Sequence, residues 1–189
     1  MPKKKSIKLY RMPAEWEKQR STLIGWPYNK KDWPNRFENI PDIFAKIISK
    51  ISHCQKVRVL IRNNGSRKVI KSKLKKCNGR LNNIQFIYCK TDRVWMRDSG
   101  PIFIKDEKNK NILSNWKFNG WAKYKNYKND DRVNFKIKKY YKSKIISPKY
   151  KKKPIVLEGG SIDVNGKGLL LTTKECLLSK IQQRNFSFK

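Results

Sequence analysis

Short apolar runs that alternate with helical patterns are the sequence feature that most constrains the fold of this chain. Residues Lys56 to Arg62 (KVRVLIR) are β-branched and apolar, which predicts a buried strand that ends at Asn63-Asn64-Gly65. Before that strand, apolar residues recur every three or four positions, which predicts an amphipathic helix that begins after Pro41. Strands that alternate with helices and hairpins indicate an α/β or α+β protein.

The rest of the chain continues this alternation. Strands are expected at 23–26, 84–89 and 155–157, a helix at 67–77, and hairpins joining 101–105 to 112–118 and 162–164 to 169–172. The segment 123–153 is dense in Lys, Asn and Tyr, and we expect it to be a basic insertion made of a loop and an exposed helix. Its interleaved tyrosines suit a nucleic-acid face, although a solvated surface is the commoner explanation of a charge run.

The charge of the chain is extreme. Lys and Arg number 47 against 14 Asp and Glu, a formal net charge of +33. A surface of this kind gathers phosphates, so a basic nucleic-acid-binding module is one hypothesis. Asn and Ile are also abundant and add nothing to phosphate binding, so compositional drift from A/T-rich codons is the favoured explanation of the charge.

Cysteine usage and the N-terminus predict a cytoplasmic protein. The four cysteines include no CxxC pair, which argues against a zinc or redox motif. The basic start MPKKKSIKLY has no apolar segment behind it, and no apolar run is long enough to span a membrane. We therefore expect neither a secretory signal nor a membrane partner.

Two acidic residues stand out against the basic background. Asp98 lies before Ser99-Gly100-Pro101, and Glu158 precedes two glycines that would let the backbone turn and a ligand approach. Two carboxylates that point into one cavity suit a planar cation such as a guanidinium. The alternative is that Asp98 only accepts hydrogen bonds from its own turn. Trp95 precedes Asp98 by three residues, so the chain must bend there for both to line one pocket.

Four segments resemble, in order, the motifs of the agmatine deiminase and bacterial peptidylarginine deiminase family of guanidine-modifying enzymes. They are RMPAEWEKQRSTLIGWP, VWMRDSGPIFI, NWKFNGWAKY and VLEGGSIDVNGKGLLLTTKECLLS. Together they extend from Arg11 to about Asn185, and four such segments in register are highly specific.

The resemblance implies a fold and an activity. The fold would be a pentein-type α/β propeller of ββαβ modules, with residues 1–189 forming the N-terminal part, about half, of one catalytic domain. The activity would be hydrolysis of a guanidinium to a ureido product and ammonia, as when agmatine becomes N-carbamoylputrescine in putrescine biosynthesis. A cysteine thiolate attacks the guanidinium carbon in such enzymes. No cofactor and no metal are implied.

The resemblance also assigns roles to residues of this chain. Asp98 would hold the guanidinium nitrogens, and Glu158 would support a catalytic histidine. Trp95 would form a wall of the pocket, and Asp163 would add negative charge to it. The substrate would be a small cationic guanidino compound, either agmatine or an arginine side chain, and the position of Arg93 leaves that choice open.

Two catalytic segments of the family have no match here. The family's histidine lies in a GHxD segment and its cysteine in a GGGxxHC segment, and this chain has only His53, which we expect to be a surface or cap residue. We therefore expect the isolated chain to be inactive, as a truncated product or as half of a split enzyme that needs a C-terminal half or another copy. A non-catalytic guanidinium-binding pseudoenzyme is the remaining alternative.

Overall fold

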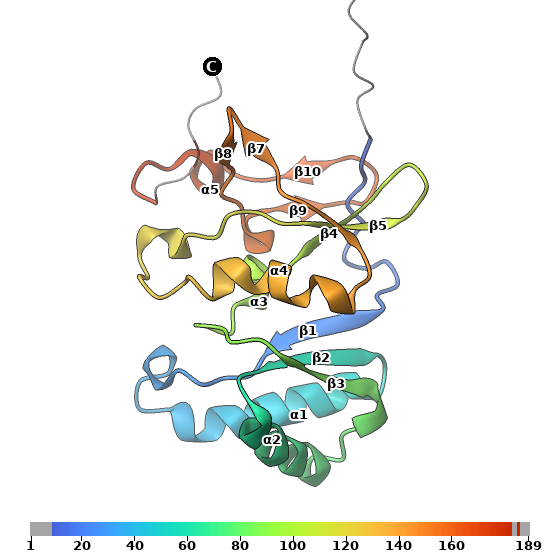
Figure 1. Ribbon diagram of the computed structural model, residues 1–189, viewed down its shortest axis with the longest axis vertical. Coiled ribbons are helices and arrows are strands. Elements are labelled where there is room, and N and C mark those ends of the chain that lie inside the picture. Colours follow the sequence, from blue (N-terminus) through green and yellow to red (C-terminus); the bar gives the residue numbers. More distant parts are fainter. Residues whose placement is uncertain (1–8, 183–184, 186–189) are drawn as a thin grey trace, which may run out of the picture.

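A three-stranded parallel sheet forms the lower half of the molecule (Figure 1). The computed structural model describes residues 9–182 and residue 185. The sheet has the order β1-β2-β3, and two helices follow its strands in the chain. These elements are β1 (Ser21–Gly25), α1 (Ile40–Ser52), β2 (Lys56–Ile61), α2 (Asn64–Lys76) and β3 (Ile84–Tyr88).

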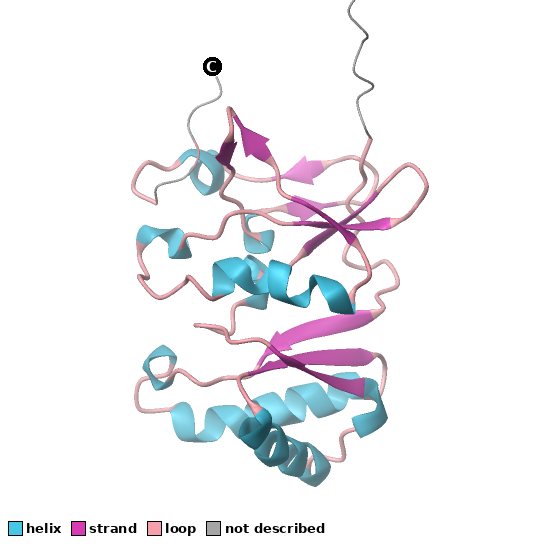
Figure 2. Ribbon diagram, viewed as in Figure 1, coloured by secondary structure: helices cyan, strands magenta, loops and turns pink. Residues whose placement is uncertain are grey.

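Both faces of this sheet are covered, which explains why β2 carries buried apolar residues on both of its faces. On one face, Val57 and Val59 pack with α1 and α2 (Figure 2). On the other face, Leu60 and Ile87 pack against a short helix of the upper half, α4 (Val133–Ile137). The buried strand predicted from the sequence is therefore confirmed, and the class is α/β.

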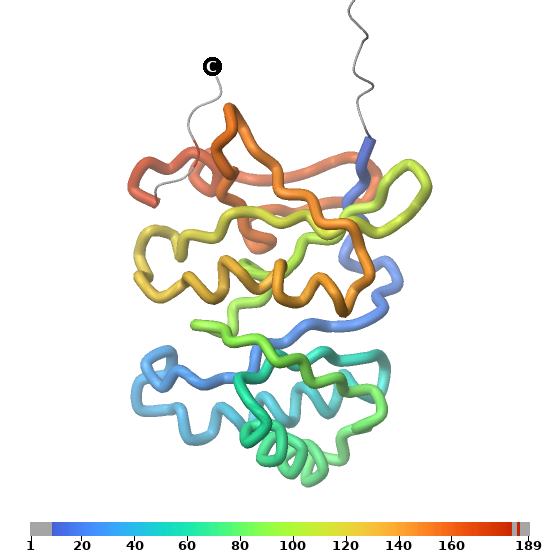
Figure 3. Tube along the Cα trace, viewed as in Figure 1, coloured from blue at the N-terminus to red at the C-terminus, as the bar shows by residue number. Residues whose placement is uncertain are grey.

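The upper half consists of small sheets and short helices (Figure 2), and Figure 3 traces the path of the chain through them. A hairpin of β4 (Ile102–Lys105) and β5 (Asn111–Ser114) is extended by β6 (Lys144–Ile146), which runs parallel to β5. Two further antiparallel pairs are β7 (Lys149–Tyr150) with β8 (Lys153–Pro154), and β9 (Asp163–Val164) with β10 (Leu170–Leu171). The remaining α-helices of the upper half are α3 (Met96–Ser99) and α5 (Lys174–Leu178).

Short 3-10 helices connect these elements. They are η1 (Lys30–Asp32), η2 (Phe37–Asn39), η3 (Leu81–Asn83), η4 (Gly120–Ala122), η5 (Asp130–Arg132), η6 (Lys138–Tyr140) and η7 (Gly159–Ser161). None of the helices in the described part of the chain combines the length and the apolar character that a membrane span requires.

Two predicted boundaries were wrong for identifiable reasons. Helix α2 begins at Asn64, earlier than predicted, because the Asn63 side chain accepts a hydrogen bond from the Ser66 amide at 2.9 Å and caps the helix. The Asn-Asn-Gly stretch thus ends a strand and starts a helix. The predicted strand 155–157 is instead an isolated parallel bridge in which Val156 pairs with Lys117.

The segment 123–153 does not form the exposed helix that was expected. Val133 and Ile137 of α4 are fully buried against the parallel sheet, and β6 from the same segment completes the β4-β5-β6 sheet. Its tyrosines are half-buried and contact other rings: Tyr141 meets Phe103 in a tilted arrangement with ring centroids 4.9 Å apart, and Tyr127 meets Phe118 edge-on at 6.4 Å. Rings engaged in this way are not available as a stacking platform for bases.

A reciprocal pair of aspartates joins the two halves of the molecule. The Asp130 carboxylate accepts hydrogen bonds from the amides of Asp92, at 2.8 Å, and Arg93, at 3.1 Å. The Asp92 carboxylate in turn accepts from the amide and the side chain of Asn129, each at 2.7 Å. Asp130 is almost fully buried, and this burial raises its pKa to about 7 although the two amides oppose the shift.

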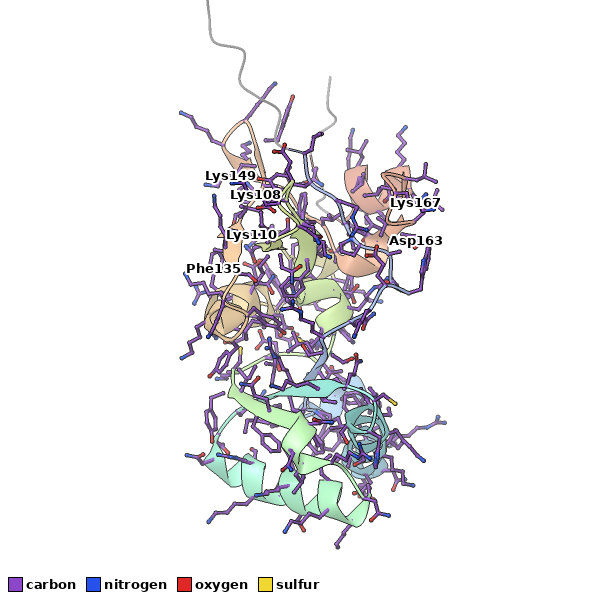
Figure 4. All side chains as sticks on the ribbon, turned by 90° about the vertical axis from the view of Figure 1, so that its right-hand side faces the viewer. Lys108, Lys110, Phe135, Lys149, Asp163 and Lys167 are labelled. Carbon is purple, nitrogen blue, oxygen red and sulfur yellow. The ribbon has the colours of Figure 1, made fainter. Side chains whose placement is uncertain are left out.

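We expect Ile137→Ala to lower the free energy of unfolding by about 2–4 kcal/mol, because it leaves a cavity between α4 and the sheet. Phe135→Ala on the same helix is the matched control. Phe135 is 48% exposed and points outward in Figure 4, so its loss should cost less than about 1 kcal/mol. Urea unfolding of both variants measures the difference. Equal costs would contradict the packing of α4.

We expect Asp130→Asn to remove a pH dependence of stability. The pKa of Asp130 is raised from 3.8 to about 7 by folding, so the folded state binds more protons between these values. The stabilising contribution is full below pH 4 and is lost as the pH rises through 7. The wild type should therefore lose up to about 4 kcal/mol relative to the variant over this window. Unfolding measured from pH 4 to 8 provides the test, and a flat difference curve would refute it.

Candidate active site

The short helix α3 supplies the bend that Trp95 and Asp98 require. Trp95 is the residue before the helix, and its carbonyl accepts hydrogen bonds from the amides of Asp98, at 3.1 Å, and Ser99, at 3.0 Å. The Ser99 hydroxyl donates to the same carbonyl at 3.0 Å. One helical turn brings residues three apart to neighbouring positions. Trp95 and Asp98 are therefore held on one side of a fixed turn.

The two glycines after Glu158 bring that residue next to α3. A Cβ added to Gly159 would lie 2.5 Å from the carbonyl oxygen of Arg97. One added to Gly160 would lie within 3.0 Å of Asp98 Oδ1. Only glycine permits the approach of position 159 to the Arg97 carbonyl, whereas a side chain at position 160 would displace the Asp98 carboxylate. The sequence interpretation had assigned both glycines to a sharp turn and the approach of a ligand. They admit a neighbouring segment of the protein, and they place Asp98 close to the Glu158 strand end.

The two carboxylates differ in their environment. Glu158 is completely buried, and its Oε2 accepts a hydrogen bond from the Ser161 hydroxyl at 2.8 Å. Asp98 is only half-buried. A buried carboxylate requires such partners, because removing its charge from water is costly. Ser161 was missed by the sequence analysis, and its position three residues after Glu158, inside the glycine motif, was the available signal.

Asp163 lies in a different setting. It is exposed on β9, and its Oδ1 accepts a hydrogen bond from the amide of Val164 at 2.8 Å. Figure 4 shows it on the flank of the upper half, on the same side as Lys167 and on the opposite side from Phe135. This geometry gives no support to a place for Asp163 in the pocket, and its substrate-binding role stays a prediction.

Trp95 belongs to an aromatic cluster that the sequence analysis only partly recognised. Its ring centroid lies 5.1 Å from those of Trp121 and Tyr124, both in edge-on arrangements. Trp121 also meets Phe118 edge-on at 5.4 Å. The backbone of Trp121 is left-handed, with φ of 57°, a strained conformation for a bulky residue that aims its ring into the cluster. The motif NWKFNGWAKY thus builds the wall around Trp95.

Arg93 extends this wall as a buried cation. Its guanidinium lies 4.9 Å from the Trp95 ring centroid and 4.5 Å from that of Tyr124. It forms an ion pair with Asp32 and donates a hydrogen bond to Asn126 at 2.8 Å. Only 10% of the Arg93 side chain and 4% of the Asp32 side chain are exposed. Arg93 is therefore a fixed element of the site.

Two cavities are lined by neighbours of Trp95 and Asp98 in the chain, although neither is lined by Trp95, Asp98 or Glu158 themselves. Met96 and Arg97 line a cavity of about 1230 Å³ between the two halves of the molecule. Arg93 lines another of about 540 Å³. Chemically, carboxylates beside an aromatic wall can bind a planar cation and hold its plane fixed.

Within residues 9–182 and 185, no cluster of His, Cys, Asp and Glu has the geometry of a metal site. His53 is the C-cap of α1, and its ring nitrogen lies 2.9 Å from the Asn78 carbonyl oxygen, as predicted for a surface or cap residue. Cys89 is buried and burial raises the pKa of its thiol, which keeps it protonated and unreactive.

Comparison with known proteins relates this site to a family. An agmatine deiminase from Pseudomonas aeruginosa (strain LESB58) is 33% identical over 175 residues, which are 90% of this chain and 45% of that protein. The solved agmatine deiminase of Enterococcus faecalis superposes with a TM-score of 0.76 at 27% identity, covering 90% of this chain and 45% of that one. An agmatine deiminase from C. jejuni, solved with substrate bound, gives a TM-score of 0.77 at 28% identity, covering 96% and 50%.

The chain thus spans about half the length of the relatives that it matches. Residues 11–189 match the family model of the Porphyromonas-type peptidyl-arginine deiminases. This match covers all four segments that carried the resemblance and confirms it. By this match, the chain belongs to the Porphyromonas-type peptidyl-arginine deiminase family.

Proposed function

We propose that this chain provides the guanidinium-binding part of a deiminase-type hydrolase. The observation that carries the proposal is the close approach of Gly160 to Asp98. It brings Asp98 to the strand end of Glu158, beside the Trp95 wall. The similar proteins that are agmatine deiminases support chemistry on a guanidino group.

In the proposed reaction, a guanidinium and water give a ureido group and ammonia. The Asp98 carboxylate accepts hydrogen bonds from two guanidinium nitrogens and fixes the plane of the group, which presents its carbon to a nucleophile. Glu158, enclosed beside Ser161, orients and charge-supports the histidine of the reaction. Agmatine, giving N-carbamoylputrescine for putrescine synthesis in the cytoplasm, and an arginine side chain are the candidate substrates.

The catalytic cysteine and histidine would come from polypeptide that corresponds to the uncovered half of the relatives. The complete domain would then be a pentein-type propeller, of which the two halves seen here are modules. Leu169, Leu170 and Leu171 are 68%, 52% and 70% exposed on the β9–β10 hairpin. Apolar side chains on such an open hairpin are suited to being covered by a further module or another copy.

We expect Asp98→Asn to weaken binding of guanidino compounds, because the neutral amide loses charge-assisted acceptance from the guanidinium. The expected loss is about tenfold or more in Kd. Titration of the purified chain with agmatine, followed through the Trp indole NMR signals, measures it. Asp42→Asn on α1, where Asp42 pairs with Lys73 at the surface, is the matched control and should stay within about twofold. Unchanged affinity in Asp98→Asn would overturn the proposal.

We expect Gly160→Ala to weaken the same binding, because the new methyl group would occupy the space of Asp98 Oδ1 and displace the carboxylate. Gly160 is itself exposed, so the fold should survive. Gly65→Ala is the control, since a Cβ there meets only the Asn63 side chain at 3.5 Å. The same titration, with circular dichroism to verify folding, decides the matter. A folded Gly160→Ala variant with wild-type affinity would show that this contact does not position Asp98.

A further inference from the structure

The cavity of about 1230 Å³ lies between the start of β1 and the β4-β5-β6 sheet. Its lining comes from three separate stretches of chain, residues 13–23, 101–112 and 141–144, together with Arg58 of β2 and the first residues of α3. Lys110, labelled in Figure 4, belongs to it and lies on the turn between β4 and β5. A space of this volume can hold a ligand made of several linked groups.

The lining of this cavity is strongly cationic. Among the described residues it includes eight Lys and Arg side chains against three Asp and Glu. Such an excess raises the local concentration of anions. Besides Arg58 and Arg97, the lining cations are Lys18, Arg20, Lys105, Lys110, Lys142 and Lys144.

The three carboxylates of the lining are already engaged with groups of the protein. Glu15 forms an ion pair with Arg97, and Glu17 forms one with Arg11, which itself is outside the lining. Asp106 accepts hydrogen bonds from two backbone amides of its own turn, at 3.0 and 2.8 Å. The carboxylates therefore leave most of the lining cations without a counter-ion.

Arg58 is a fixed cation at this cavity. It lies on the same face of β2 as Leu60, and its guanidinium is 4.0 Å from the Tyr141 ring centroid. Its Nε and Nη1 are buried without a hydrogen-bond partner, and it takes part in none of the ion pairs in the described part of the chain. Gln85, opposite it on β3, is neutral. A charge withdrawn from water in this way is stabilised by a nearby anion.

We propose that this cavity binds a polyphosphate group, of the kind found in inorganic tripolyphosphate and in nucleoside triphosphates. Each phosphate carries more negative charge than a carboxylate and offers three acceptor oxygens. A row of linked phosphates can meet cations that come from separate stretches of chain, with the planar guanidinium of Arg58 and the flexible lysines as donors. This site is separate from Asp98 and Glu158, and it does not rest on the proposed function.

Titration of the full chain with tripolyphosphate, ATP and citrate tests the proposal. At about 0.15 M salt, tripolyphosphate should bind once per chain and about tenfold more tightly than citrate. Met96 lines the cavity, so the NMR signal of its methyl group should shift with the same Kd. This local signal matters because a chain of net charge +33 attracts anions over much of its surface.

Two variants of the cavity and one control identify the site. Arg58→Leu should weaken tripolyphosphate binding about tenfold or more, because a charged donor is lost. Lys142→Gln/Lys144→Gln changes exposed residues, so the fold should survive, and the expected loss is about threefold to tenfold. Lys75→Gln/Lys76→Gln removes the same charge from α2, which packs on the other face of the parallel sheet, and should stay within about twofold.

The outcomes are decisive in either direction. Equal affinities for tripolyphosphate and ATP would support a site for the phosphates alone, and tighter ATP would support a site for a nucleotide. Citrate that binds as tightly as tripolyphosphate, an unchanged Met96 signal or the same loss in both lysine variants would indicate general attraction to a basic surface and overturn the proposal. Wild-type affinity in a folded Arg58→Leu variant, or no binding at all, would overturn it too.

Discussion

The contact between Gly159-Gly160 and the helix α3 is the constraint on which the site depends. It brings together two chain segments that are about sixty residues apart, with Gly159 against the backbone carbonyl of Arg97 and Gly160 against the side chain of Asp98. Because glycine has no Cβ, both contacts are closer than a larger residue would allow. The position of Asp98 relative to Glu158 therefore depends on these two glycines.

The few acidic residues of this basic chain hold its structure together. Asp32 forms an ion pair with Arg93, and Glu17 forms one with Arg11. Asp92 and Asp130 accept hydrogen bonds that join the two halves of the molecule. The pKa of Glu17 is lowered to about 2, first by its hydrogen bond with Arg11. With these carboxylates engaged, most of the excess lysines lie exposed at the surface. The net charge of +33 therefore describes the chain as a whole, while the site is defined by local pairings.

Much of the fold follows from local patterns. The strands around Lys56–Ile61 and the β4–β5 hairpin were predictable, because apolar runs and turn residues act over a few positions. The packing of helix 133–137 against the parallel sheet was not predictable in this way. Two buried apolar residues in a five-residue helix, with lysines around them, are too few to distinguish a packed helix from a solvated one by their spacing. The helix is packed because the apolar face of the parallel sheet that carries Leu60 and Ile87 lies against it.

The candidate site divides in the same way. By itself, the sequence determined the family, the bend at Trp95 and the two acidic positions, because each is a short motif with its own chemistry. Only the tertiary structure decided that Gly160 meets Asp98, that Asp163 turns outward, and that Arg93 is buried in an aromatic wall. The physical reason is the distance along the chain over which each kind of interaction acts. Motifs record which groups a segment carries, whereas close approach between distant segments depends on how the sheets and helices pack.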